Sequence, residues 1–204
     1  MTSELNLRDL ICFILLLMFF VFFSYVILEN LRYMLSQYNP KIALYFGHRY
    51  AARQVEAGHM AGGGYILSKQ ALIKLVKNLE SNKKECRSTD GAEDLEMGRC
   101  LAHSAIFVDC RDELHQKRFF PIGVKEHMKK TVKPDFWYTK SQYYHVQQGN
   151  TSCCSDTSVE FHYIKPHEMY VLEYFIYHVH PFGLDDHFDE ELPKKFTLKE
   201  IIAA

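Results

Sequence analysis

The sequence predicts an α/β domain that follows one apolar, membrane-spanning helix near the N-terminus. Leu10 to Leu28 are 19 consecutive residues without a charge, whereas the rest of the chain alternates short apolar runs with amphipathic segments. Such alternation of strands and helices is typical of α/β domains. The 204 residues suffice for one domain of ordinary size, and aromatic residues, at 14%, are plentiful enough to build its core.

The apolar segment has the length of a membrane span. A helix of 19 residues is roughly 28 Å long, about the thickness of the hydrocarbon core of a bilayer. The run is longer than the apolar part of a signal peptide, and no small-residue cleavage site follows it. We therefore expect residues 1–9 to form a cytoplasmic tail, 10–28 a transmembrane signal anchor and 29–204 a lumenal domain.

Two features favour this type II orientation, because the basic residues that flank the span discriminate poorly. Asn150-Thr151-Ser152 is an N-glycosylation acceptor pattern, and five of the six cysteines follow the span. Both are typical of a domain in the secretory lumen. The 24 basic and 25 acidic residues nearly balance, so charge gives no reason to expect a nucleic-acid partner.

The first half of the domain is predicted from apolar spacing and from turn residues. Asn39-Pro40 ends the first helix, because a residue before proline avoids the α conformation. Ser68 is a typical N-cap for the second helix. The expected elements are, in order, a helix over 29–38, a strand over 43–46, a polar loop over 48–56, a glycine-rich loop over 58–65, a strand over 65–67 and a helix over 69–79.

The second half contains fewer regular elements. Glu80 to Gly91 is charged and is expected to be a solvated loop, and the cluster Phe136-Trp137-Tyr138 lies in another polar loop. The expected elements are a helix over 92–103, a strand over 106–108, an alternating strand over 159–163 and an aromatic-rich helix over 169–179.

Three motifs carry residues that are capable of chemistry, and each has a structural alternative. Glu93-Asp94 can act as a general base at a helix start, or can simply favour the helix N-terminus. Gly62-Gly63-Gly64 lets a backbone approach a ligand closely, or forms a tight turn. His162, in its alternating strand, is a metal ligand or a satisfied core histidine.

The cysteines indicate a lumenal domain with disulfides. Cys86 and Cys100 flank the Glu93-Asp94 segment and can link its two sides. Cys153 and Cys154 are adjacent, and each is expected to pair with a distant cysteine. Five cysteines cannot all pair within one chain, so one is free or intermolecular.

These motifs, in this order, resemble one family. GGGYILSKQAL, EDLEMGRC, FFPIGVKEH, CCSDTSVEFHYI and MYVLEYFIYHVHPFG look like the C-terminal half of the core 1 β1,3-galactosyltransferases (T-synthases) of glycosyltransferase family 31. The resemblance extends from about Tyr25 to Gly183. It implies a partial, Rossmann-like GT-A domain in a single-pass type II protein of the Golgi or ER membrane.

The resemblance also implies a reaction. The family transfers galactose from UDP-galactose to N-acetylgalactosamine on Ser or Thr of a glycoprotein, with inversion to a β1,3 bond. By family position Asp94 is the base, with Glu93 beside it, and His162 is a ligand of Mn²⁺. The segment from Gly62 through Gly63 and Gly64 to Tyr65 lines the nucleotide sugar. Trp137 and Tyr138 contact the sugar or the acceptor.

One departure from the family pattern affects the expected activity. The family reads Asp-Asp-Asp-Thr where this chain has Phe22-Phe23-Ser24, so the D-x-D carboxylates that share the metal with His162 are absent. We therefore expect little or no transfer by this chain alone.

The alternative function is that of a non-catalytic chaperone or partner of a core 1 enzyme. A homodimer, or a heterodimer with a full-length family member, is the expected assembly.

Overall fold

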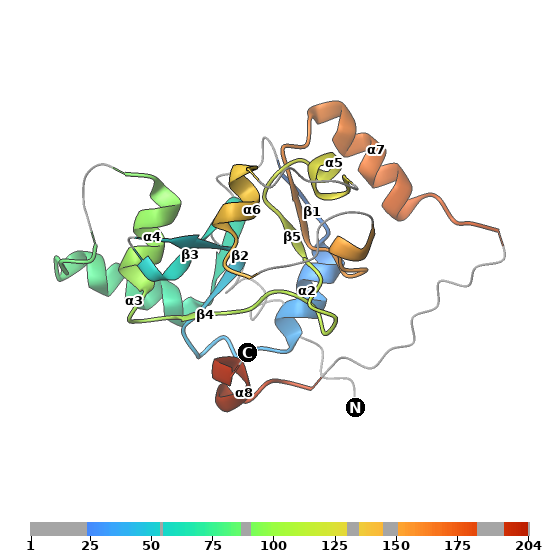
Figure 1. Cartoon of the computed structure of the whole chain (residues 1–204). Coiled ribbons are helices and arrows are strands. Elements are labelled where there is room, and N and C mark those ends of the chain that lie inside the picture. The colour runs from blue at the N-terminus through green and yellow to red at the C-terminus, as the bar shows by residue number, and fades with distance from the viewer. Residues whose placement is uncertain are drawn as a thin grey trace.

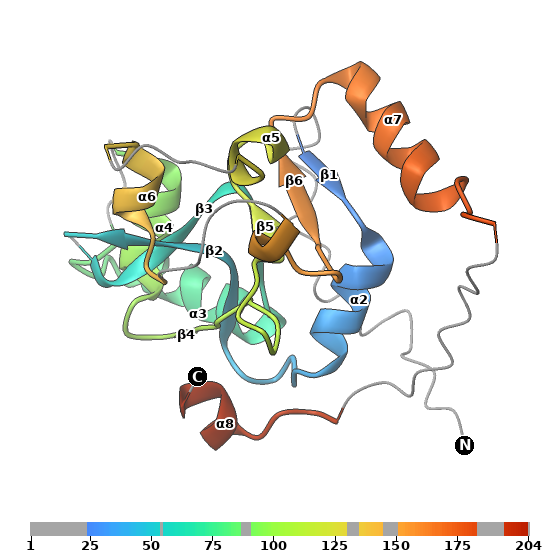
Figure 2. The same ribbon diagram turned by 45° about the vertical axis from the view of Figure 1, so that its right-hand side comes forward.

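The computed structural model describes residues 24–53, 55–86, 91–129, 135–144, 151–182 and 194–203. They form a mixed α/β fold around two three-stranded sheets, as Figures 1 and 2 show. The predicted α/β class is therefore confirmed. Within these ranges no helix has the length and apolar character that crossing a bilayer requires, and residues 10–23 of the predicted span lie outside them.

The first sheet has the order β3-β2-β4 and contains the longest strands of the described chain. β2 (Leu44–Ala52) and β3 (Val55–Leu67) form an antiparallel hairpin, and β4 (Ile106–Phe107) lies parallel to β2. The loops expected over 48–56 and 58–65 are therefore wrong. Polar composition misled the prediction, because Tyr50 is buried and its pairing with His59 holds the hairpin together.

Two helices cover one face of this sheet (Figure 1). In α3 (Lys69–Glu80) the predicted cap is confirmed, because the Ser68 hydroxyl accepts a hydrogen bond of 3.1 Å from the Ala71 N–H. α4 (Glu93–Leu101) begins where the sequence predicts. A disulfide joins Cys86 to Cys100 and ties the connecting segment to α4. Between helices and sheet lies an apolar core of Ala43, Tyr45, Met60, Leu67, Ala71, Leu75, Cys100, Leu101 and Phe107.

The second sheet joins parts of the chain that are far apart in sequence. β6 (Glu160–His162) is central, antiparallel to β1 (Ser24–Val26) and parallel to β5 (Phe119–Phe120). The expectation of one helix through residue 28 is wrong for its last residues. Residues 24–26 pair with β6, so their backbone hydrogen bonds are made between strands and not within a helix.

The predicted helix over 29–38 is found as α2 (Leu28–Ser36), whose buried Leu31, Met34 and Leu35 pack into the core.

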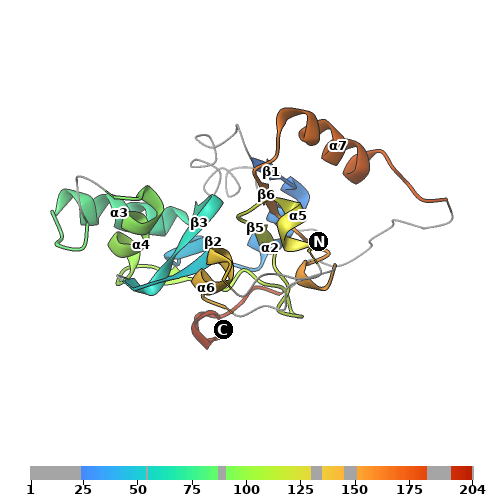
Figure 3. The same ribbon diagram turned by 45° about the horizontal axis from the view of Figure 1, so that its top comes forward.

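Two carboxylates tie α7 (Pro166–Tyr177) to this region. Tyr25 donates to Glu173 at 2.7 Å, and Tyr177 donates to Glu29 at 2.6 Å. Figure 3 shows α7 standing away from the body of the fold. The short helices are α5 (Val124–His127), α6 (Trp137–Ser141), a 3₁₀ turn (Thr151–Cys153) and α8 (Leu198–Ala203).

The remaining cysteines depart from the prediction in one respect. Cys153 and Cys154 form a disulfide with each other, so the expectation that each pairs with a distant cysteine is wrong. Cys110 is buried and is the free thiol among the described residues. It lies next to β2, where its sulfur accepts a hydrogen bond from the Gly47 N–H at 3.3 Å. One of the five cysteines from Cys86 onward is therefore unpaired in the structure, as the odd count predicts.

Candidate active site

Glu93 and Asp94 form the first turn of α4, where the helix dipole favours negative charge. The two carboxylates have different surroundings. Glu93 accepts a short hydrogen bond from the Tyr65 hydroxyl. Asp94 accepts from the Leu95 N–H at 2.7 Å, and its other oxygen lies 3.9 Å from Nε2 of His59. The Asp94 side chain is 34% exposed, and Glu93 is also exposed but is bound by the Tyr65 hydroxyl, so Asp94 is the more available of the pair.

In this α4 wall (His59, Tyr65, Glu93 and Asp94), the histidine and the tyrosine have shifted pKa values. Burial lowers the pKa of His59, and the Asp94 charge partly opposes this shift. Burial and the Glu93 carboxylate both raise the pKa of Tyr65, so the phenol keeps its proton and holds Glu93 in place. Asp94 is thus a carboxylate with one oxygen free to accept a proton from a ligand.

Gly98 explains how α4 comes so close to β3. A Cβ at this position would lie 2.5 Å from Cβ of His59 and 3.0 Å from the carbonyl oxygen of Gly58. Only glycine permits this approach, because Cβ atoms essentially never come that near. The glycine in the EDLEMGRC motif therefore positions Asp94 opposite His59.

The opposite side of the site is a β6 wall formed by Ser24, Glu160 and His162. The Ser24 hydroxyl donates to the carbonyl of Gly63 at 3.1 Å and lies 2.9 Å from Nδ1 of His162. Because the hydroxyl has one proton, which Gly63 accepts, Nδ1 of His162 is the donor in the second contact. Nε2 of the neutral imidazole then carries the lone pair. Metal-binding histidines are oriented in this way, by an acceptor at the second ring nitrogen.

Glu160 is the least satisfied group of this wall. Its carboxyl is 3% exposed, and neither oxygen has a hydrogen-bond partner of normal geometry among the described residues. Burial raises the pKa of Glu160 to about 8, and the nearby Ser24 hydroxyl opposes that rise. Gly63, at φ 92°, makes room for the carboxyl, because a Cβ there would lie 2.0 Å from Oε1 of Glu160.

These donors fit a divalent cation as a partial site. Glu160 and His162 stand at alternate positions of one strand, so both side chains leave the same face. An orphaned buried carboxylate and an imidazole with its lone pair on Nε2 are ligands that Mn²⁺ accepts. No group of three or more such side chains gathers at one point in the described ranges. The remaining ligands would therefore come from a bound diphosphate or water.

An aromatic floor connects the two walls. Tyr50 stacks on His59 with ring centres 5.7 Å apart, and Trp137 lies 6.2 Å from Tyr50. Trp137 is 57% exposed, so its ring offers a face to a sugar. Tyr138 is 1% exposed and packs on His127 instead, so it supports the floor from beneath.

The two walls are linked through β3, because Gly63 lies against Glu160 and His59 lies near Asp94. Burial raises the pKa of Tyr50, and Tyr163, Asp94 and Glu160 add to the rise. Tyr163 follows His162 in a left-handed conformation, with φ at 57°, which is uncommon outside glycine and recurs at functional sites. The predicted Gly62, Gly63, Gly64 and Tyr65 lie in β3 between the walls.

Sequence reasoning missed Glu160, His59 and Tyr50. One signal was available for Glu160, which stands two residues before His162 in a strand with alternating pattern. His59 and Tyr50 lay in segments predicted as loops, so their pairing across the hairpin was not visible.

No family model matches the chain. A relative from Xenopus laevis, glycoprotein-N-acetylgalactosamine 3-beta-galactosyltransferase 1, is 39% identical over 164 residues. This match covers 78% of the chain and 44% of the relative. The chain therefore spans less than half the length of the curated relative that it matches.

Proposed function

Because the chain is a relative of the core 1 β1,3-galactosyltransferases over most of its own length, we propose that it is a galactosyltransferase of that class. The reaction moves galactose from UDP-galactose to the 3-hydroxyl of N-acetylgalactosamine on Ser or Thr of a glycoprotein. The observation that carries the proposal is the available carboxylate of Asp94 at the start of α4, which lies 3.9 Å from His59 in a site with an exposed tryptophan.

Asp94 is the general base of this proposal. The free oxygen of Asp94 accepts the proton of the acceptor hydroxyl. At the same time the oxygen of this hydroxyl attacks the galactose carbon from the side opposite to UDP, which inverts the configuration. Glu93 does not compete for this role, because the Tyr65 hydroxyl already binds it. Trp137 offers an apolar face for the acceptor sugar, and Gly64 leaves space beside β3 for the donor.

His162 and Glu160 are the residues of this chain that would hold a divalent cation such as Mn²⁺. When bound, such a cation neutralises charge on the departing diphosphate. The chain lacks the D-x-D carboxylates at Phe22-Phe23-Ser24, so we expect weaker cation binding and slower transfer than in a family member that has them. We also propose a GT-A arrangement of the domain, because the chain is a relative of the core 1 β1,3-galactosyltransferases.

The decisive experiment measures transfer from UDP-galactose to a GalNAc-peptide in the presence of Mn²⁺, with the linkage assigned by NMR. We expect slow β1,3 transfer, which Asp94→Asn should lower by roughly 10²–10⁴-fold. Glu93→Gln is the matched control, because it removes the neighbouring charge and keeps the helix start. Equal rates for wild type and Asp94→Asn would refute the base assignment, and a complete lack of transfer would refute the catalytic function.

Location and assembly form a separate part of the proposal. We propose that residues 10–23 belong to a single-pass type II anchor in the Golgi or ER membrane, and that the chain pairs with itself or with a longer family member. Glycosylation at Asn150 would place the domain in the lumen. Loss of an endoglycosidase-sensitive mass shift in Asn150→Gln tests this, and an unmodified Asn150 would argue against lumenal exposure.

A further inference from the structure

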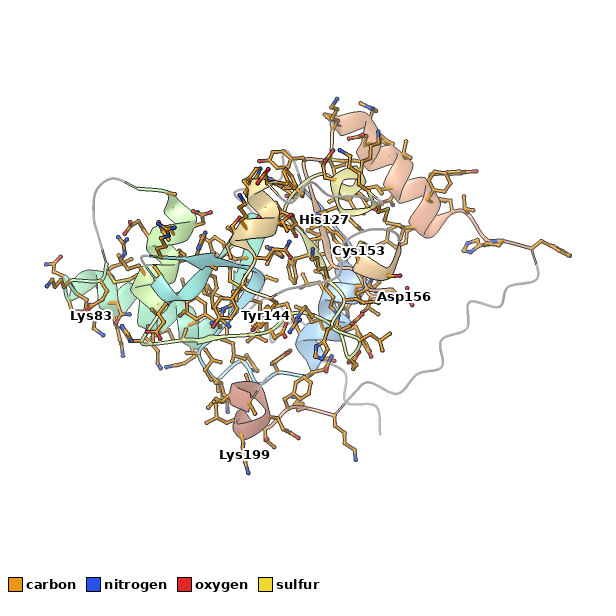
Figure 4. All side chains as sticks on the ribbon, viewed as in Figure 1. Lys83, His127, Tyr144, Cys153, Asp156 and Lys199 are labelled. Carbon is orange, nitrogen blue, oxygen red and sulfur yellow. A yellow bond between two sulfur atoms is a disulfide. The ribbon has the colours of Figure 1, made fainter. Side chains whose placement is uncertain are left out.

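A small cavity beside β2 is lined by an excess of positive charge. Its volume is about 30 Å³, too little for a nucleotide, and it is partly open to solvent. Asp94, Glu160 and His162 do not line it, so it is separate from the candidate active site. The charged and aromatic side chains around it are Arg49, Asp109, Arg111, Lys117, Arg118 and Tyr144, the last of which is labelled in Figure 4.

One carboxylate faces four cations in this lining. Asp109 pairs with Arg111, with its two oxygens 3.0 Å and 2.6 Å from Nε and Nη2 of the guanidinium. Arg118 donates to the Thr157 hydroxyl and reaches Glu113 at 3.8 Å, but the Glu113 side chain is 76% exposed and screened by water. The remaining cations have no carboxylate partner among the described residues.

Lys117 is the most unusual member. It is 3% exposed, and its ammonium has no carboxylate partner in the described ranges. It lies 5.0 Å from the centre of the Tyr138 ring, and burial lowers its pKa to about 8. The nearby His48 and His127 are kept neutral by burial, so neither offers it a charge. A buried, unpaired ammonium is costly unless an anion satisfies it.

The neighbouring groups are held in place before any ligand arrives. Hydrogen bonds from the Lys117 N–H to Cys153 and from the Ser155 N–H to Lys117 fix its backbone at 3.0 Å and 2.9 Å. Arg49 stacks 3.7 Å from the Tyr143 ring centre and donates to the Tyr144 hydroxyl at 3.0 Å. The Arg111 guanidinium lies 4.1 Å from the Tyr144 ring centre. Preorganised donors lose little entropy on binding.

We propose that this cavity binds a single phosphate-sized oxyanion, held by Lys117 and by the arginines Arg49, Arg111 and Arg118. Guanidinium groups match the geometry of such oxyanions, and the Lys117 ammonium gains the charged partner that it lacks. The oxyanion is either free inorganic phosphate or the terminal group of a phosphorylated small molecule. The proposal does not depend on galactosyl transfer.

The test uses the full chain and inorganic phosphate as the probe. Wild type, Lys117→Met and Lys117→Gln are titrated with sodium phosphate at pH 7, with ionic strength held constant by sodium chloride. Calorimetry gives the affinity and thermal unfolding gives Tm. We expect a saturable rise in the wild-type Tm of roughly 2–5 °C, and loss of that rise in both variants. Without phosphate the Lys117→Met protein should be at least as stable as wild type, because it lacks the buried charge.

Lys83→Met is the matched control, since Lys83 is exposed and lies far from Tyr144 in Figure 4. It should respond to phosphate as wild type does. A second titration with glycerol phosphate separates the two sources: binding of both ligands shows a cavity open to an esterified phosphate, and binding of inorganic phosphate alone shows a closed one. The absence of saturable binding by wild type, or an equal response of wild type and both Lys117 variants, would overturn the proposal.

Discussion

The two sheets differ in how their charged side chains are paired. Around β3-β2-β4 the charges near the active site have partners, such as Tyr65 with Glu93 and Arg99 with Glu96 at 2.7 Å, and a disulfide closes the region. Around β1-β6-β5 the carboxyl of Glu160 is buried without a hydrogen-bond partner among the described residues, and the buried Lys117 side chain has no carboxylate partner there.

The difference separates stability from ligand binding. Paired groups stabilise the first sheet by themselves, whereas orphaned ionisable groups cost free energy until a ligand of opposite charge arrives. Glu160 fits a cation and Lys117 fits an anion. The second sheet is therefore the part of the molecule whose stability should respond most to ligands and to pH.

The largest expected effect on this contrast is the pH dependence of stability that Lys117 causes. Its pKa is about 8 in the folded protein and about 10.4 in an unfolded chain. Between these values the unfolded state binds more protons, so the free energy of unfolding rises with pH, by roughly 3 kcal/mol across the window. The Lys117 penalty is complete below pH 8.

The measurement is urea unfolding of wild type and Lys117→Met from pH 7 to 10.5 in phosphate-free buffers. Tyrosines and Cys110 titrate in both proteins, so the difference between the two curves isolates Lys117. We expect Lys117→Met to be the more stable protein at pH 7 and to lose that advantage as the pH rises. A constant difference would mean that the lysine is not desolvated as the structure indicates.

In the first sheet, by contrast, removal of the Cys86–Cys100 disulfide should lower the free energy of unfolding. The two residues are 14 apart in sequence, so loss of the link in a Cys86→Ala, Cys100→Ala double variant should cost about 2–3 kcal/mol. The control is the Cys153→Ala, Cys154→Ala double variant, since adjacent cysteines close almost no loop. Chemical denaturation at one pH compares the two. Equal losses would show that side-chain packing, and not loop closure, dominates.

The sequence predicts the local parts of both regions and misses the long-range ones. The helices α2, α3 and α4 follow from apolar spacing, a serine cap and an acidic first turn, all of which act over a few residues. The β1–β6 pair joins Ser24 to His162, 138 residues apart, and no local pattern reports such a partner.

Residues of the site divide in the same way. Asp94 and His162 could be proposed from motifs, whereas Glu160 gains its importance only from burial next to Gly63. The hairpin of β2 and β3 was missed because Arg49 looks like a loop residue in the sequence. In the fold, its guanidinium is stacked against the Tyr143 ring.

Gly98→Ala tests how closely the first sheet and α4 are fitted. The added methyl group would meet Cβ of His59 at 2.5 Å, so α4 must move away, at a cost of about 2 kcal/mol. Gly64→Ala in β3 is the control, because nothing lies within 4 Å of its Cβ position. Urea unfolding should place Gly64→Ala within about 0.5 kcal/mol of wild type. Similar losses in both variants would show that the contact between α4 and His59 does not set the cost.

The smallest expected effect on stability concerns Ser24, which orders the second sheet's histidine. Ser24→Ala removes the acceptor for the Nδ1 proton of His162 and the donor to Gly63, at about 1 kcal/mol. Ser24→Thr keeps the hydroxyl and should preserve both contacts.

Nitrogen NMR of labelled histidine reports which ring nitrogen carries the proton. We expect His162 to be protonated at Nδ1 in wild type and in Ser24→Thr, and to become a mixture in Ser24→Ala. Because a free Nε2 lone pair is what a cation needs, Mn²⁺ affinity should fall by roughly 10-fold or more in Ser24→Ala alone. An unchanged tautomer in that variant would mean that Ser24 does not orient the histidine.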